Sequence, residues 1–585
     1  MIAQKIVFPL LCNEKIFDVK YQKKNNYKSV NNIEFPYSRN QTYYLIVLLR
    51  GKYLIMTVAE YIANQLFING IRYVFGIPGG PSIPYLEAFR KAGIEFILTS
   101  NEAAAGIMAD VTARFTKIPG VCHATFGPGA TNIATGIGGA LLDRSPVIVF
   151  TSEMGEIMIN RTTQMNIDHQ KLFEPLTKAT FRLNTLNTRE VIEKALRISM
   201  ASYPGPVHIG LPADIADYEI IYDPYPDFIN EKTIPNNDIN KIKTLLEASR
   251  FPVIAVGLTA ARLGLKKELL KLLDKHRIPV VLTPMAKGIL NEGHECYAGV
   301  LFHSLSDYLG ELFEKTDLVI GLGYDPVEFN YESWIPDVAL VHFDLKVTDM
   351  PSSINSVQYT GMPEEWFRMM EHLNISSLLS QKTVIEGIRN EMNAVFNGFT
   401  GHFGPAAALK ALQDELPEDT VITADVGSHL HLIGQFWHTG DKGKVIMTNG
   451  WSGMGFGIPA ALAAQLNNRD ATVVCITGDG GFLMMAGEIV TARRYNLPVI
   501  IVIFSDGELN LIKVKQSWKN ISPYGTILCQ DDLFGSGVFL GVKVLRADSS
   551  ATMHKAVIEA LSVNEPVIIN AVIDPEDYQW LIVKR

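Results

Sequence analysis

Several features that define other protein classes are missing from this 585-residue sequence. Its five cysteines are scattered and form no Cys-x-x-Cys pair, which argues against a disulfide framework and against a zinc site. Lysine and arginine total 52 against 61 acidic residues, so the formal net charge is −9 and a general nucleic-acid-binding surface is not expected. We therefore expect a protein of the reducing cytoplasm that acts on small molecules.

The sequence also offers little that would hold it in a membrane. The apolar segment at residues 43–56 is interrupted by Arg50 and Lys52 before it reaches the roughly 20 residues that a spanning helix needs. Residues 1–55 carry nine Lys/Arg against three acids and show no amphipathic period, whereas a helical period starts directly after Met56. We expect the enzyme proper to begin at Met56, with residues 1–55 either an extension or the result of a misassigned start codon.

Beyond Met56, short apolar runs alternate with helical stretches, which is typical of parallel α/β sheets with buried strands. The chain is too long for one hydrophobic core. We predict an α/β fold of three consecutive doubly wound parallel-sheet domains, at residues 56–225, 240–375 and 405–585. A polar stretch with several Pro and Asn residues, at about 222–240, predicts a linker between the first two domains.

A glycine-rich turn follows a predicted strand of the third domain. Gly478-Asp479-Gly480-Gly481 comes directly after TVVCIT, and the next predicted strand ends in Ser505-Asp506-Gly507. At such strand ends a glycine-rich turn lets backbone N–H groups approach phosphate, and the next helix adds its positive dipole end. Mg²⁺ prefers oxygen ligands, which suits Asp479, Asp506, the carbonyl oxygen of Glu508 and a diphosphate. Taken alone, however, the turn could be only a tight turn.

This turn and five further motifs together resemble the thiamine-diphosphate enzyme family. In that family GDG is followed by a spacer and then usually by Asn-Asn, and residues 481–504 form the corresponding spacer here. Those motifs, in the family's order, are Ile77-Pro78-Gly79-Gly80, Ser100-Asn101-Glu102-Ala103-Ala104, Gly127-Pro128-Gly129-Ala130-Thr131-Asn132, Asp425-Val426-Gly427-Ser428-His429 and Gly450-Trp451-Ser452-Gly453-Met454-Gly455-Phe456-Gly457. The resemblance implies thiamine diphosphate and Mg²⁺ as cofactors, and pyrimidine-binding, central and diphosphate-binding domains. Ser505-Asp506 departs from Asn-Asn, but Asp506 can still bind the metal, with an added negative charge.

The resemblance also implies roles for single residues. Glu102 would lie against the N1′ nitrogen of the cofactor's aminopyrimidine, where a poorly solvated carboxyl group, with its raised proton affinity, can share a proton. Met454 would support the bent cofactor from below, and the carbonyl of Ser452 would hold its 4′-amino group. The implied cofactor-binding residues are Gly79, Gly80, Glu102, Gly427, Ser428, His429, Ser452, Met454, Asp479, Gly480 and Gly481. Alone, Glu102 could be a helix N-terminal acid, and His429 a neutral surface histidine.

Within the family the sequence is most similar to acetolactate synthases, especially the catabolic, flavin-independent kind. The similarity rests on residues 161–164 (RTTQ), 172–178 (LFEPLTK), 323–329 (GYDPVEF) and 448–450 (TNG). It implies that the enzyme decarboxylates a 2-oxo acid such as pyruvate and joins the remaining unit to a second 2-oxo acid, giving 2-acetolactate. Gln164 would lie beside the reacting carbon as a catalytic residue. Another carboligase, lyase or decarboxylase of the family, acting on a different 2-oxo acid or an aldehyde, would share the same motifs.

Two further points bear on substrates and partners. Lys515 stands where acetolactate synthases usually present a large aromatic residue; it is either a solvated helix lysine or a pocket residue that favours an anionic acceptor. The central domain has no GxGxxG, so the expectation is against FAD. Because the Glu102 motif and the diphosphate motifs come from different subunits in this family, the resemblance implies a homodimer or homotetramer.

Overall fold

The computed structural model describes residues 54–222, 238–329, 334–373, 379–529 and 532–582. The expected extension, residues 1–55, lies outside the described residues apart from its last two. The linker predicted at about 222–240 lies outside them apart from its ends. The domain boundaries given above therefore stay predictions.

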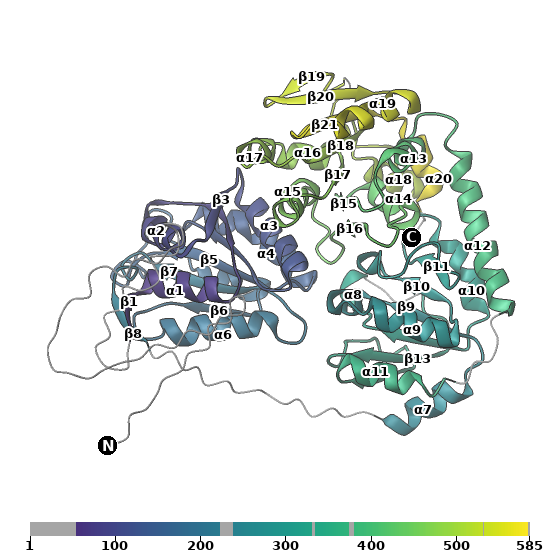
Figure 1. Ribbon diagram of the computed structural model, residues 1–585, viewed down its shortest axis with the longest axis horizontal. Coiled ribbons are helices and arrows are strands. Elements are labelled where there is room, and N and C mark those ends of the chain that lie inside the picture. The colour runs from purple at the N-terminus through teal and green to yellow at the C-terminus, as the bar shows by residue number, and fades with distance from the viewer. Residues whose placement is uncertain (1–53, 223–237, 330–333, 374–378, 530–531, 583–585) are drawn as a thin grey trace, which may run out of the picture. The chain divides into compact units, whose positions relative to one another are not determined.

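The first domain, purple to blue in Figure 1, is built on a six-stranded parallel sheet. Its strand order is β3-β2-β4-β5-β7-β6. Its strands are β2 (Tyr73–Ile77), β3 (Glu95–Leu98), β4 (Gly120–Ala124), β5 (Val147–Glu153), β6 (Ala179–Arg182) and β7 (Val207–Pro212). Its helices are α1 (Val58–Ile68), α2 (Ile83–Ala92), α3 (Glu102–Thr116), α4 (Pro128–Leu142), α5 (His169–Phe173) and α6 (Thr188–Met200), with 3₁₀ turns η2 (Gly80–Ser82) and η3 (Glu174–Leu176).

Both faces of this first sheet are covered, as a doubly wound fold requires. Side chains of α1, α2 and α6 share one apolar core with one face of the strands. Side chains of α3 and α4 share a second core with alternate residues of the same strands, such as Phe75 and Val149. Because successive strand residues point to opposite faces, continuous apolar runs such as the fully buried β4 and β5 fill both cores.

The second sheet is also six-stranded and parallel, with order β11-β10-β9-β12-β13-β14. Its strands are β9 (Pro252–Val256), β10 (Val280–Leu282), β11 (Tyr297–Val300), β12 (Leu318–Leu322), β13 (Ala339–Asp344) and β14 (Ser356–Thr360). The surrounding helices are α7 (Ile239–Ala248), α8 (Leu258–Leu263), α9 (Lys266–His276), α10 (Gly310–Glu314) and α11 (Pro363–Met370), with η4 (Pro284–Ala286), η5 (Ser306–Leu309) and η6 (Pro326–Glu328). The long helix α12 (Leu379–Gly398) precedes the third domain.

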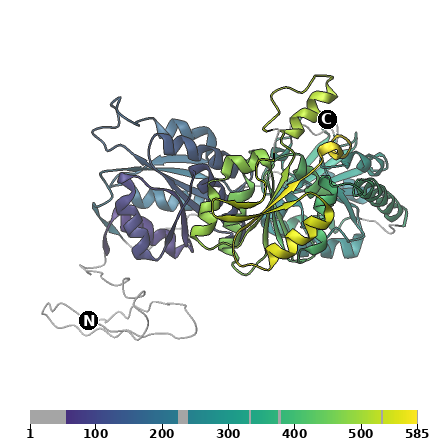
Figure 2. The same ribbon diagram turned by 90° about the horizontal axis from the view of Figure 1, so that it is seen from above.

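The third sheet has seven strands in the order β16-β15-β17-β18-β21-β20-β19, of which only the β19–β20 pair is antiparallel. The strands are β15 (Val421–Ala424), β16 (Lys444–Ile446), β17 (Val473–Gly478), β18 (Ile500–Ser505), β19 (Gly537–Phe539), β20 (Val542–Ala547) and β21 (Val567–Val572). The helices are α13 (Pro405–Glu415), α14 (Ser428–Phe436), α15 (Gly457–Asn467), α16 (Asp479–Met485), α17 (Glu488–Arg494), α18 (Asn510–Trp518), α19 (Ser550–Leu561) and α20 (Tyr578–Leu581), with η7 (Pro575–Asp577). Helix α19, yellow in Figure 2, packs along β20 and β21.

The predicted fold class is confirmed: three α/β domains with parallel sheets follow one another along the chain. Two details differ from it. Besides the antiparallel β19, strands β1 (Leu54–Thr57) and β8 (Glu219–Tyr222) form a separate antiparallel pair that closes the first domain.

None of the helices within the described residues combines the length and the apolar composition needed to cross a membrane.

Helix α3 joins the first domain to the third. Its first twelve residues are all buried, because it packs on α4 and on α15 at the same time. At its end the buried Arg114 forms ion pairs with Asp110 (2.6 Å) and Asp143 (2.8 Å) and donates to the carbonyl oxygen of Met447 (2.7 Å). The backbone that leads into the motif at 450–457 is thus attached to the first domain.

Candidate active site

Three of the sequence motifs lie at one edge of the third sheet. Strands β15, β17 and β18 are neighbours and parallel, so their carboxyl ends lie at the same edge. The motif at 425–429 follows β15, the turn at 478–481 follows β17, and Ser505-Asp506-Gly507 follows β18. The sequence prediction that these motifs form one site is therefore supported by the strand order. Ligands of parallel α/β sheets bind at this edge.

Asp425 connects its own segment to the motif at 450–457 and to the turn at 478–481. Its carboxylate is fully buried and accepts hydrogen bonds from the backbone N–H of Gly455 (2.9 Å) and the hydroxyl of Thr477 (3.1 Å). A Cβ on Gly481 would lie 2.7 Å from the Asp425 carboxylate, so this position needs glycine. Burial raises the pKa of Asp425, and these donors oppose that shift. The loop that carries Met454 is thereby held against the turn that carries Asp479.

Met454 lies over that turn. A Cβ on Gly480 would come within 2.9 Å of both the Met454 methyl carbon and the Leu509 side chain, so only glycine fits beneath them. Ser452, two residues before Met454, adopts a left-handed φ of 52° and donates its hydroxyl hydrogen to the carbonyl of Asn449 (2.7 Å). This turn presents the methionine toward Gly480.

The segment Gly427-Ser428-His429 carries buried polar atoms that lack a protein partner. The Ser428 hydroxyl oxygen and the Nε2 nitrogen of His429 have no hydrogen-bond partner among the described residues, although both side chains are buried at the N-terminus of α14. Burial lowers the pKa of His429 to about 4, so the ring is neutral. The alternative of a surface histidine is wrong. Buried polar groups normally have partners, and the Ser428 hydroxyl at a helix N-terminus can donate to an oxygen of a diphosphate.

Asp479 and Asp506 form the acidic part of the site. The Asp479 carboxylate is buried and accepts from the backbone N–H groups of Gly480 (2.8 Å), Asp506 (3.2 Å) and Gly507 (2.7 Å). Burial and then the charge of Asp479 raise the pKa of Asp506 to about 8. Two carboxylates that repel each other in a poorly solvated position fit a divalent cation.

Glu508 contributes differently from these two aspartates. Its backbone N–H donates to the Asp506 carboxylate (3.1 Å), and its side chain forms an ion pair with Lys513 (2.6 Å). The carboxylate of Glu508 is thus neutralised by Lys513. The role of the Glu508 backbone carbonyl as a metal ligand stays a prediction.

Glu102 lies in the first domain, at the first residue of α3. Its side chain is only 8% exposed, and its carboxylate accepts a hydrogen bond from the Asn132 amide (3.1 Å). A Cβ on Gly129 would lie 3.4 Å from the same carboxylate. The motifs at 100–104 and 127–132 are therefore in direct contact, and one carboxylate oxygen is left beside the glycine turn.

Glu488 was missed by the sequence analysis. It is fully buried at the start of α17, and one carboxylate oxygen accepts from the backbone N–H groups of Ser100 and Asn101, both at 2.9 Å. The Ser100 hydroxyl also donates to the carbonyl of Gly487 (2.8 Å). The third domain thus holds the two residues that precede Glu102. The available signal was a lone acidic residue in the stretch GFLMMAGEIV.

Two of the four segments that resemble those of acetolactate synthases are in contact. The Asn449 amide donates to the carbonyl of Glu328 (2.7 Å), so the segments at 323–329 and 448–450 are in contact. Asp325 forms an ion pair with Arg144 of the first domain (2.6 Å). Burial raises the pKa of Glu328 to about 8. All three domains therefore contribute polar groups to this junction.

Family models match each of the three domains. They are described as thiamine pyrophosphate enzyme N-terminal TPP binding domain (residues 56–172), central domain (239–369) and C-terminal TPP binding domain (425–571). The chain belongs to the thiamine pyrophosphate enzyme family. The two TPP binding domains are those that carry Glu102 and Asp479, and thiamine diphosphate is the cofactor of this protein.

Curated relatives of this thiamine pyrophosphate enzyme align with almost the whole chain. A "Probable acetolactate synthase large subunit" of Methanocaldococcus jannaschii is 31% identical over 89% of this chain and 93% of its own length. An "Acetolactate synthase" of Bacillus subtilis is 27% identical over 89% of this chain and 93% of its own length. The "Acetolactate synthase isozyme 2 large subunit" of Escherichia coli is 27% identical over 90% of this chain and 97% of its own length.

Three further predicted residues of this thiamine pyrophosphate enzyme, Gly79, Gly80 and Gln164, lie in the first domain. Gly79 touches Thr125, whose hydroxyl oxygen would be 2.3 Å from an added Cβ, whereas Gly80 faces open space. Gln164 is exposed, beside Met165, which packs on Gly127. The catalytic role of Gln164 and the cofactor contacts of Gly79 and Gly80 stay predictions.

Lys515 is exposed on α18, which agrees with the interpretation of a solvated helix lysine. The lysine that turns toward the acidic residues is Lys513, through its ion pair with Glu508. Both lysines lie within one helical turn, and no sequence pattern distinguishes the one that faces the site.

The raised pKa of Asp506 predicts how stability varies with pH. Because the pKa in the folded protein is about 8 and the ordinary value is 3.8, the folded state binds the extra proton between these values, and stability is lost as pH rises from about 4 to about 8. With EDTA and without cofactor, Asp506→Asn should gain Tm relative to the unmodified protein as pH rises through this window. The exposed Asp470→Asn is the control. A difference in Tm between Asp506→Asn and the unmodified protein that does not vary with pH would contradict the prediction.

Proposed function

We propose that this protein is an acetolactate synthase, which decarboxylates pyruvate and joins the remaining two-carbon unit to a second pyruvate, giving 2-acetolactate. The observation that carries the proposal is that relatives named acetolactate synthase align with about nine-tenths of the chain. The contact between Asn449 and Glu328, which joins two of the four segments that resemble that group, supports it further.

The chain's own residues account for cofactor binding. When bound, thiamine diphosphate supplies a carbon nucleophile that adds to the keto carbon of the substrate and accepts the electron pair released with carbon dioxide. The residues of the third domain would hold its charged end. Ser428 would donate to the diphosphate, and Asp479, Asp506 and the carbonyl of Glu508 would bind Mg²⁺.

Glu102 would handle the proton. Its carboxylate is poorly exposed and is oriented by Asn132, so it can hold a proton at the ring nitrogen of the aminopyrimidine. Glu488 fixes the backbone of Ser100 and Asn101 and therefore the start of the helix that carries Glu102. Met454, above Gly480, would set the height of the cofactor over the turn.

The proposal is tested by a substrate panel. Purified protein with thiamine diphosphate and Mg²⁺, but no added flavin, should release carbon dioxide from pyruvate and form 2-acetolactate, detected as acetoin after acid treatment. Glu102→Gln should lower kcat by about 10² to 10⁴, the usual contribution of a positioned acid or base. The exposed Glu87→Gln is the matched control.

Turnover of another 2-oxo acid or an aldehyde without acetoin would contradict the proposed substrate and favour a different carboligase, lyase or decarboxylase of the family. No turnover with any member of the panel would contradict the proposed enzyme class as a whole.

We also propose that the active protein is a homodimer or a homotetramer. Its support is a group of exposed apolar side chains on and after the helix that starts at Asp479: Leu483 (46% exposed), Met484 (56%) and Val490 (37%). Exposed apolar groups beside a site are typical of an interface. A cytoplasmic location is proposed as well, supported by the absence of disulfides among the described cysteines.

The oligomer is tested by light scattering coupled to size-exclusion chromatography. The protein should elute with the mass of at least two chains, and Met484→Asp should shift it toward the monomer with loss of activity, because a carboxylate in an apolar interface is poorly solvated. The exposed Ile558→Asp, in α19, is the control. A monomer with full activity would contradict the proposal.

A further inference from the structure

A chain of alternating histidine and threonine side chains crosses the first domain and ends at the Gly127 turn. Thr180 and His208 Nδ1 lie 2.6 Å apart, His208 Nε2 and the Thr151 hydroxyl 2.7 Å, and that hydroxyl and His169 Nδ1 2.8 Å. At the far end the backbone N–H of Gly127 donates to His169 Nε2 (3.5 Å). Both histidines and Thr151 are buried.

The direction of every hydrogen bond in this chain follows from its last member. A backbone N–H can only donate, so His169 Nε2 accepts and the proton of this ring is on Nδ1. His169 then donates to Thr151, whose single hydrogen goes on to His208 Nε2. His208 in turn donates from Nδ1 to Thr180. Burial lowers the pKa of His169 to about 4 and lowers that of His208 well below its ordinary value, so each ring holds one proton.

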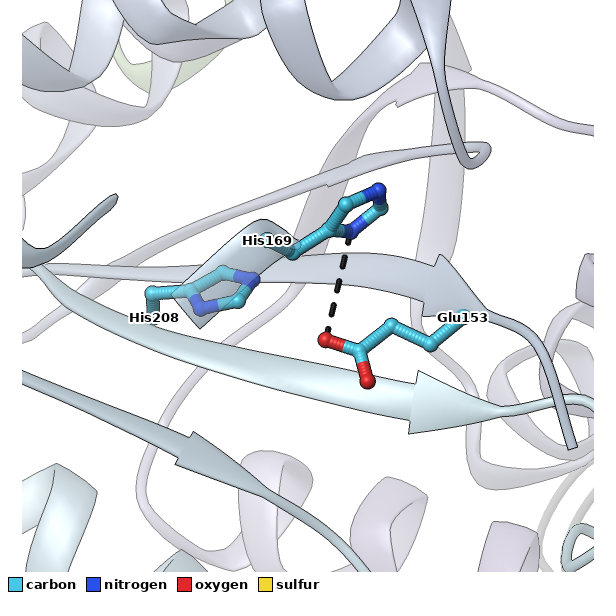
Figure 3. Close-up of side chains that lie close together, drawn as sticks. All are labelled: Glu153, His169 and His208. Carbon is cyan, nitrogen blue, oxygen red and sulfur yellow. Dashed lines mark ion pairs between the residues drawn. The ribbon is translucent and has the colours of Figure 1, made fainter. Parts of the chain in front are cut away.

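Glu153 supports the same assignment. Its carboxylate lies 3.9 Å from His169 Nδ1, as the dashed line in Figure 3 marks, and a negative charge there favours a proton on that nitrogen. An ion pair with Arg182 (2.9 Å) and a hydrogen bond accepted from the Gln170 amide (2.5 Å) hold the Glu153 carboxylate in place.

Glu153, His169 and His208 also have the composition of a metal site, since their ligand atoms lie within 4.8 Å of one another. The contacts oppose this interpretation. The Thr151 hydroxyl bonds to both ring nitrogens that would face an ion, and Arg182 already pairs with the carboxylate. The described arrangement is a completed hydrogen-bond chain.

The turn at the end of the chain lies against Glu102. Gly127 has a left-handed φ of 64°, and a Cβ there would come within 2.8 Å of the Met165 carbonyl oxygen. Two residues further on, Gly129 faces the Glu102 carboxylate. We infer that His169 is a positioning residue: its Nε2 nitrogen holds the Gly127 turn and thereby the groove beside Glu102, and Thr151, His208 and Thr180 fix its tautomer.

This inference rests on the role proposed for Glu102, and two variants test it. Glutamine at position 169 places an acceptor near the former Nε2 and can still bind the Gly127 N–H, whereas asparagine reaches only as far as Nδ1 and can serve Thr151 alone. His169→Asn should lower kcat about tenfold, the effect of one lost hydrogen bond at a buried donor, and His169→Gln should stay within about threefold. His554→Gln, on α19, is the control.

Two measurements do not depend on turnover. In ¹⁵N spectra of the histidine rings, the unmodified protein should show His169 and His208 as the Nδ1–H tautomer. In hydrogen–deuterium exchange, residues 125–131 should exchange faster in His169→Asn than in His169→Gln. If the protein makes no acetolactate, the proposed function fails, while the tautomer and the exchange rates still decide the present inference.

Three results would overturn it: the Nε2–H tautomer for His169, equal kcat and exchange in the two variants, or one equivalent of zinc in the purified protein that is lost in His208→Gln. The last result would assign the cluster to a metal instead.

Discussion

The buried carboxylate of Asp425 is the interaction on which the cofactor site depends. It accepts from the Gly455 backbone and from Thr477, and it lies where a side chain on Gly481 would have to be. One acceptor therefore fixes the Met454 loop relative to the turn that carries Asp479. Because a buried carboxylate is costly without donors, the segments that supply them are held in one arrangement.

The same principle joins the first domain to the third. Glu488 is buried, and the backbone donors of Ser100 and Asn101, just before Glu102, satisfy its carboxylate. Arg114 attaches the other end of the same helix to the backbone at Met447. Both ends of α3 are thus tied to the domain that carries the acidic residues, so the position of Glu102 depends on polar contacts from outside its own domain.

The three sheets and the position of the motifs at strand ends could be predicted from the sequence, because continuous apolar runs and glycine turns are local patterns. It could not identify Glu488 or His169. No motif marks either residue, and its importance comes from partners on other elements of the fold, Ser100 for Glu488 and Thr151 for His169. The burial of His429 could not be predicted for the same reason, because its neighbours in the sequence do not show which segments pack against it.

The central claim is that the first and third domains supply the two sides of the thiamine diphosphate site, with Asp425 organising the diphosphate side and Glu488 fixing the start of the helix that carries Glu102. A crystal structure of the full chain with thiamine diphosphate and Mg²⁺ tests it most directly. The account predicts the diphosphate against Ser428, His429 and Gly480, and the cation between the carboxylates of Asp479 and Asp506. A cofactor bound away from the carboxyl ends of β15 and β17, or a cation that touches neither carboxylate, would contradict it.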